Sequence, residues 1–173
     1  ALIAALRARE IDLAIGLCVS PQPDIDTQRL KDEPILLAVG EHHALATHTT
    51  VEMQELEGET FALDDAAQQS GYNAAVVALC ASHGLCAKTR QTQGHRDVWE
   101  HAVLHDGCVG LTTASAIHAA NRRLRLLAVR AADSFPLDLL WLSADEASTT
   151  AAIRTTLNLA AAVSAGERWI AGG

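Results

Sequence analysis

Short apolar runs with the length of β-strands alternate with segments of helical periodicity along this chain of 173 residues. The two clearest helical segments are 71–83, with Ser70 as the expected N-cap and Gly84 as its stop, and 96–107, which ends at Gly107. The runs expected to form strands are 11–16, 33–40, 59–65, 85–92, 108–113, 124–130 and 136–143. Strands that alternate with helices of about 10 to 15 residues are typical of α/β domains with mainly parallel sheets.

Three further helical segments complete the expected order. One covers residues 1–10, a short one lies near 114–121, and the last begins near Asp145 or Glu146, whose charges suit a helix N-terminus. The apolar stripe of the last helix is Ile153, Leu157, Ala160 and Val163.

Two connections are candidates for crossings between two lobes. The first is the polar stretch 41–50, and the second is 133–136, which ends in proline. Two crossings place the middle of the chain in one lobe and both ends in the other. We therefore expect lobe one to contain residues 1–46 and 134–173, and lobe two to contain residues 47–133.

Composition restricts the function of this segment. Its net charge is -8 and its 13 lysines and arginines are scattered, which argues against contacts with nucleic acid phosphates. None of the four cysteines forms a C-x-x-C pair, as expected for a reduced, cytoplasmic protein. No apolar run approaches the 18 or so residues of a membrane helix. The chain begins without methionine, within an expected helix, so we expect it to be truncated at its N-terminus.

Four motifs carry a resemblance to a known family. They are EIDLAIG (10–16), LKDEPILLAVGEHHALA (30–46), VEMQELEGETFAL (51–63) and HAVLHDGCVGLTTAS (101–115). In this order and spacing the chain resembles, from about residue 1 to 165, the effector-binding domain of LysR-type bacterial transcription regulators.

The resemblance implies a periplasmic-binding-protein-like fold, with two α/β lobes joined by two crossover strands and a small effector bound in the cleft between them. It also implies that the first lobe is incomplete, because its first strand, first helix and second strand have no counterpart here. The winged helix-turn-helix domain that precedes this region in the family is absent from the chain as well.

Hydroxyl side chains follow the expected strand 108–113. Ligands of open α/β sheets bind beyond the carboxyl ends of strands, where Thr112, Thr113 and Ser115 stand. The family usually has proline at the position of Thr113, so this wall of the site is more polar than usual. The alternative is that these hydroxyls cap the short helix that follows.

Two other strand ends are expected to face the same cleft. One is Leu17–Cys18, and the other is Asp64–Asp65, with Tyr72 at the start of the next helix. Family effectors are often carboxylates, which two adjacent acids would repel. The acids therefore point to solvent, or the effector is neutral or cationic; the alternative is that this pair is only a loop and helix-start signal.

The spacing of the histidines and cysteines matches neither a metal-binding motif nor a redox motif. His101 and His105 share a helix face, but the H-E-x-x-H pattern is absent. Cys80 resembles the second cysteine of the peroxide-sensing family members, yet the first would fall near Gly71. We expect buried core cysteines, and we expect neither a metal nor a cofactor.

The sequence also lacks G-x-S-x-G, P-loop and G-x-G-x-x-G motifs, so we do not expect an enzyme. The function expected from the resemblance is effector sensing, with DNA bound only through the absent N-terminal domain and a dimer or tetramer formed by the intact protein. A solute-binding protein of a transport system is the first alternative, and a metal-dependent enzyme is the second.

Overall fold

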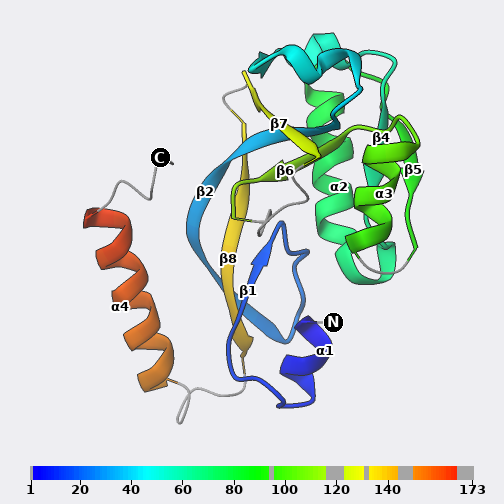
Figure 1. Ribbon diagram of the computed structural model, residues 1–173. Coiled ribbons are helices and arrows are strands. Elements are labelled where there is room, and N and C mark those ends of the chain that lie inside the picture. The colour runs from blue at the N-terminus through cyan, green and yellow to red at the C-terminus, as the bar shows by residue number, and fades with distance from the viewer. Residues whose placement is uncertain (1, 94–95, 116–122, 131–132, 144–149, 167–173) are drawn as a thin grey trace. The chain divides into compact units, whose positions relative to one another are not determined.

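The computed structural model describes residues 2–93, 96–115, 123–130, 133–143 and 150–166 (Figure 1). The chain divides into two compact units. Unit 1 contains residues 1–32 and 136–173, and unit 2 contains residues 33–135. The chain passes from one unit to the other inside two strands, β2 (Ile25–Gly40) and β8 (Ser134–Leu142).

These passages lie at 32/33 and 135/136, whereas the lobe boundaries expected from the sequence are 46/47 and 133/134 and stay a prediction. The strand β2 is longer than its apolar part. Its residues Asp26–Arg29 are exposed, so this part of the strand has no apolar face that a periodicity search could detect.

Unit 1 is built on the antiparallel pair of β1 (Ala14–Leu17) and β8, in which Ala14 lies opposite Leu140. The helix α1 (Leu2–Arg7) buries Leu6 completely in a core with Ala14, Ile25 and Leu140. The helix α4 (Thr150–Gly166) also belongs to this unit. Its Ile153 is buried and its Leu157 and Ala160 are half-buried, as the predicted apolar stripe requires; the side chain of Val163 lies outside the described part.

Unit 2 contains five further strands: β3 (Thr50–Val51), β4 (Thr60–Leu63), β5 (Lys88–Gln91), β6 (Gly110–Thr113) and β7 (Leu124–Val129). The strand β2 lies between β6 and β7, and β3 pairs with β7 on the other side. The pair of β4 and β5 joins this sheet through a bridge between Phe61 and Val109.

The expectation of mainly parallel sheets is wrong for the central strands. The pairs β1–β8, β2–β6 and β2–β7 are antiparallel, whereas β3–β7 and β4–β5 are parallel. Apolar periodicity gives the position of a strand but not its direction. The prediction of an α/β fold with helices between strands is confirmed.

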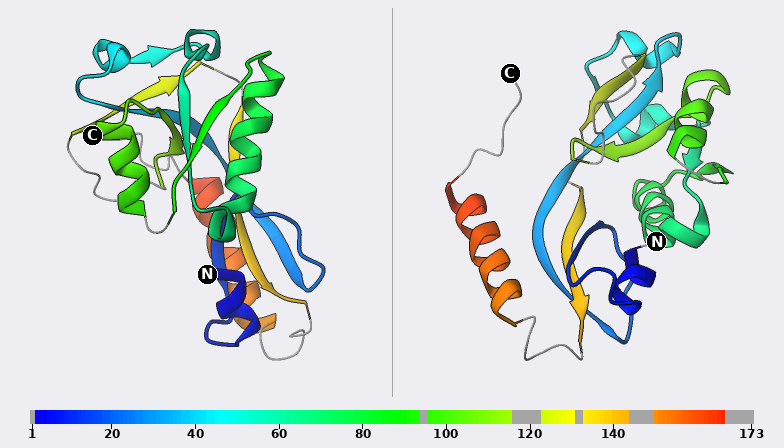
Figure 2. Two further views of the ribbon diagram at one scale, coloured as in Figure 1. Left: turned by 90° about the vertical axis from the view of Figure 1, so that its right-hand side faces the viewer. Right: turned by 60° about the horizontal axis from the view of Figure 1, so that its bottom comes forward.

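Two helices of unit 2 lie on opposite faces of the β4–β5 pair (Figure 2). They are α2 (Ala66–Ser82) and α3 (Arg96–His105); the 3₁₀ helices η1 (Ala44–Thr47) and η2 (Met53–Leu56) lie before them in the chain. The helix α3 packs close to the sheet because Gly110 has no side chain: a Cβ atom there would lie 2.0 Å from Cζ2 of Trp99. Trp99 itself is 4% exposed and donates from Nε1 to the carbonyl oxygen of Ala62 at 3.0 Å.

The observed ends of α2 and α3 can be compared with the predicted N-cap and the predicted glycine stops. Gly84 and Gly107 have φ values of +74° and +69° just after α2 and α3, which confirms them as stops. Ser70 is not an N-cap, because α2 begins four residues earlier, at Ala66, and Ser70 lies inside it. The expected helix near 114–121 and the expected start at Asp145 or Glu146 fall largely or wholly outside the described residues. No helix in the described ranges is long and apolar enough to cross a membrane.

Candidate ligand-binding site

The carboxyl ends of three strands of unit 2 lie at one edge of its sheet. The strands β4 and β5 are parallel, with Leu63 opposite Gln91, and the Phe61–Val109 bridge to the start of β6 is also parallel. Thr92 fixes the ends of β4 and β5 to each other, because its hydroxyl donates to the carbonyl oxygen of Leu63 at 2.8 Å. Asp64, Thr92 and the end of β6 therefore come to the same edge, as the general rule for α/β sheets led us to expect.

The three predicted hydroxyls differ in their surroundings. Thr113 is fully buried, and its Oγ1 lies 3.5 Å from Oγ of the half-buried Ser115. The hydroxyl of Ser115 donates in turn to a carboxylate oxygen of Glu33, at the point where β2 enters unit 2. Thr112 is 4% exposed, and its hydroxyl forms no hydrogen bond to any residue that the structure describes. Of the three, Thr112 therefore has the hydroxyl whose hydrogen is not taken by a described residue.

Glu33 is the residue of this cluster that sequence reasoning missed. It is 2% exposed, although it stands between an aspartate and a proline in a polar stretch that indicates a surface turn. Nothing in its local pattern predicts burial, because burial arises from its contact with a residue 82 positions later in the chain.

Tyr72 holds α2 against the end of β6. Its hydroxyl donates to the carbonyl oxygen of Leu111, and its ring meets that of Phe135 edge-on, with centroids 6.0 Å apart. Because the backbone carbonyl of Leu111 takes the hydrogen of this hydroxyl, Tyr72 has no donor to offer a ligand. Its role in binding stays a prediction.

Asn73, which the sequence analysis did not single out, fixes the Asp64–Asp65 segment. Its side chain accepts from the backbone N–H of Asp64 at 3.0 Å and donates to the carbonyl oxygen of Asp64 at 2.8 Å. The two aspartates are half-buried, so they are neither fully solvated nor enclosed. The two hydrogen bonds to the buried Asn73 give Asp64 a defined backbone, which a loop signal alone does not predict.

Leu17 and Cys18 belong to unit 1, whereas the other candidates belong to unit 2. Cys18 has a φ value of +49°, and its N–H donates to the carbonyl oxygen of Pro136 at 2.8 Å. Burial, together with the nearby charge of Asp138, raises the pKa of the Cys18 thiol to about 12. The thiol is therefore neutral at physiological pH and can contact a ligand only as a small apolar group.

Cys80 and Cys108 are also buried, and burial raises the pKa of their thiols as it does for Cys18. Cys86 is exposed. Because the thiolate is the reactive species, we expect an aromatic disulfide reagent at neutral pH to modify one thiol of the native protein quickly and the other three only on unfolding. The Cys86→Ser variant should lose the fast phase; a fast phase that persists in this variant would contradict the assignment.

The rings of His101 and His105 lie on α3 with their centroids 4.8 Å apart. Within the ranges that the structure describes, no group of three or more histidine, cysteine or acidic side chains is placed to hold a metal ion.

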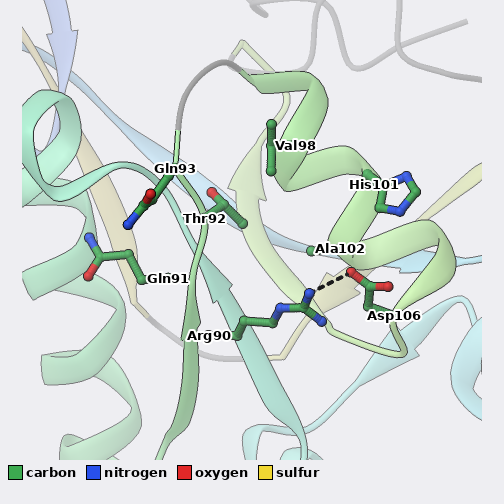
Figure 3. Close-up of a pocket in the computed structure, with 8 residues that line it drawn as sticks. All are labelled: Arg90, Gln91, Thr92, Gln93, Val98, His101, Ala102 and Asp106. Atoms are coloured by element: carbon green, nitrogen blue, oxygen red, sulfur yellow. Dashed lines mark ion pairs between the residues drawn. The ribbon is translucent and has the colours of Figure 1, made fainter.

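A shallow cavity of about 210 Å³ lies between β5 and α3 (Figure 3). The ion pair of Arg90 and Asp106, 3.0 Å long, closes one side, and Val98 and Ala102 form an apolar wall. The cavity lining contains none of the predicted ligand residues. Sequence patterns did not indicate it, because β5 is exposed throughout and its partner surface comes from the next helix.

Comparison with known proteins identifies relatives of this chain. Residues 1–169 match the family model described as LysR substrate binding domain. Over 89 residues the chain is 32% identical to the HTH-type transcriptional regulator CatR of Pseudomonas putida, which corresponds to 51% of this chain and 30% of that regulator. The chain thus spans about a third of the length of this relative.

Solved structures share the fold. The BenM effector binding domain with its effector benzoate superposes with a TM-score of 0.71 at 17% identity, over 99% of this chain and 80% of that one. The regulatory domain of Synechocystis CcmR in complex with 2-PG gives a TM-score of 0.68 at 19% identity, over 90% and 76% of the two chains. These similarities establish a periplasmic-binding-protein-like α/β fold, as the sequence analysis predicted.

Proposed function

Because this chain belongs to the LysR substrate binding domain family, we propose that it is the effector-sensing domain of a bacterial transcription regulator. The match along 169 of 173 residues is the observation that carries the proposal. The effector is a small molecule, and the DNA contacts are made by a domain outside this chain. The intact protein acts in the cytoplasm as a dimer or tetramer and is not an enzyme.

The polar edge of unit 2 supports this proposal. Thr112 and the Asp64–Asp65 backbone stand at strand ends, where α/β sheets bind small ligands. A benzoate-bound BenM domain and a 2-PG-bound CcmR domain with the same fold are consistent with a small-molecule effector. Leu17 and Cys18 remain proposed contacts from unit 1, and the division into lobes at 46/47 and 133/134 stays a prediction.

The proposed mechanism couples effector binding to the arrangement of the domain. A ligand shifts an equilibrium between two arrangements only by its difference in affinity for them. We propose that the effector favours one arrangement of the domain and that the full-length protein then binds its operator differently. The two strands that connect the units, β2 and β8, carry the change along the chain.

The test uses the full-length protein. Small molecules that are anionic, neutral and cationic are screened by thermal shift, since binding to the native state raises the melting temperature. We expect at least one compound that raises Tm and also changes the affinity for operator DNA. A compound that binds tightly and leaves DNA binding unchanged would contradict effector sensing and favour the solute-binding alternative.

Thr112→Val and Thr113→Val separate ligand contact from structural support. Valine keeps the shape of threonine and removes only the hydroxyl. We expect Thr112→Val to weaken binding of the compound found in the screen by about 1–3 kcal/mol, roughly 5- to 150-fold in Kd. Thr113→Val should lower Tm, because it removes the hydroxyl beside Ser115. Calorimetry and thermal unfolding measure the two effects, and unchanged affinity in Thr112→Val would assign this hydroxyl no ligand role.

A further inference from the structure

The hydrogen bond between Ser115 and Glu33 runs from the serine hydroxyl to Oε2 of the glutamate. A carboxylate can only accept, so the hydroxyl of Ser115 uses its single hydrogen on Glu33. Thr113 Oγ1, 3.5 Å from Ser115 Oγ, can then only donate to it. The hydrogens of both hydroxyls therefore point along the chain toward Glu33, and the lone pairs point the other way.

Ser115 is the member of this chain of hydroxyls that a ligand can reach, because it is half-buried whereas Thr113 and Glu33 are 0% and 2% exposed. A hydroxyl oxygen has two lone pairs, and Thr113 occupies one of them. Ser115 consequently offers a ligand one acceptor and no donor.

We propose that Glu33 sets the hydrogen-bond polarity of the ligand site at the end of β6, and that the ligand presents a nitrogen-borne N–H group there, as amines, amidines and guanidines do. This inference rests on the proposed function, because it names the chemical class of the effector. Glu33 acts through Ser115 and is a positioning residue, whereas Ser115 Oγ is the atom that touches the ligand.

The distribution of charge in unit 2 favours the same class. Asp64 and Asp65 follow β4 at the same edge of the sheet. The described lysine and arginine side chains of unit 2 interact with acceptors away from this edge: Lys88 with Gly58, Arg90 with Asp106, Arg123 and Arg125 with Glu41, and Arg130 with Glu52. Among the unit 2 side chains that the structure describes, a carboxylate ligand would therefore meet acceptors and acidic residues at this edge, while a nitrogen cation would meet its natural partners.

Benzamidine and benzoate form a matched pair of probes. Both carry a planar three-atom head on the same ring, but the amidinium donates where the carboxylate accepts. In calorimetry with the full-length protein at one ionic strength, we expect benzamidine to bind about tenfold more tightly than benzoate, or better. Glu33→Gln should lower this preference about tenfold, because an amide N–H can donate to Ser115 Oγ and release the serine hydrogen toward the ligand.

Two further variants control the experiment. Ser115→Ala removes the acceptor at a half-buried position and should lower the preference as well, so it carries the test if Glu33→Gln unfolds. Glu41→Gln removes one carboxylate of unit 2 that pairs with Arg123 and should leave the preference unchanged. Equal or tighter binding of benzoate, binding of neither probe, or a preference unaffected by Glu33→Gln and Ser115→Ala would overturn the inference.

The two proposals fail in different ways. If the screen yields a carboxylate that changes DNA binding and whose affinity does not respond to Glu33→Gln, effector sensing stands and the inference about its chemistry falls. If no compound of any charge changes DNA binding, effector sensing falls, whatever the preference between the two probes.

Discussion

Replacement of Trp99 by alanine is expected to lower the free energy of unfolding by about 3–5 kcal/mol. The indole is 4% exposed in a core cluster that joins β2, β4 and α3 through Ala38, Ala62, Ala102 and Val103. Its removal leaves a cavity and withdraws the N–H that donates to the carbonyl oxygen of Ala62. Urea unfolding followed by circular dichroism measures the loss.

A matched variant divides this loss into its parts. Trp99→Phe keeps a ring in the cluster and removes the N–H, so it should cost less than Trp99→Ala. Because Trp99 contacts both β4 and β6, the alanine variant should also weaken effector binding, in contrast to Thr113→Val, which is expected to act mainly on stability. A loss below about 1 kcal/mol in Trp99→Ala would mean that α3 is not anchored through this residue.

The sequence predicted the elements that bury a full apolar face. The run 108–113 became β6, and the two helix stops at Gly84 and Gly107 are where the pattern placed them. The first half of β2 escaped detection because residues 26–29 face solvent. The direction of the strands was not predicted either, since the pattern of an apolar run is the same in a parallel and in an antiparallel sheet.

The candidate site was predictable only as a location. Thr112, Thr113 and Ser115 were proposed because polar residues at the end of a buried strand indicate a site in an α/β sheet. Their different surroundings were not predictable, because they depend on Glu33, which is distant in sequence and belongs to another strand. The same limit applies to Asn73 and to the cavity beside β5, both of which are made by contacts between elements.

The close approach of α3 to the sheet also depends on one residue that sequence analysis could not interpret. Gly110 does not have a positive φ value, so no turn requires glycine there. Its role is steric: an alanine Cβ would lie 2.0 Å from Cζ2 and 2.7 Å from Cη2 of Trp99. Both distances are shorter than real Cβ contacts, so the indole or the strand must move.

We expect Gly110→Ala to lower the free energy of unfolding by about 1–3 kcal/mol, at the upper end of this range or above it, because Trp99 is enclosed and held by its hydrogen bond to Ala62. In the Trp99→Ala background the same substitution fills part of the vacated space. The cost should then fall to about zero, which gives a coupling energy of 1 kcal/mol or more between the two sites.

Gly84→Ala is the control for this double-mutant cycle. Its φ value is +74° and nothing lies within 4 Å of its Cβ position, so its cost arises from backbone strain alone. That cost should be the same with and without Trp99. If the free-energy costs of Gly110→Ala and Trp99→Ala simply add, as those of Gly84→Ala and Trp99→Ala are expected to do, then Gly110 does not provide the space for the indole. The packing of α3 on β6 must then have another cause.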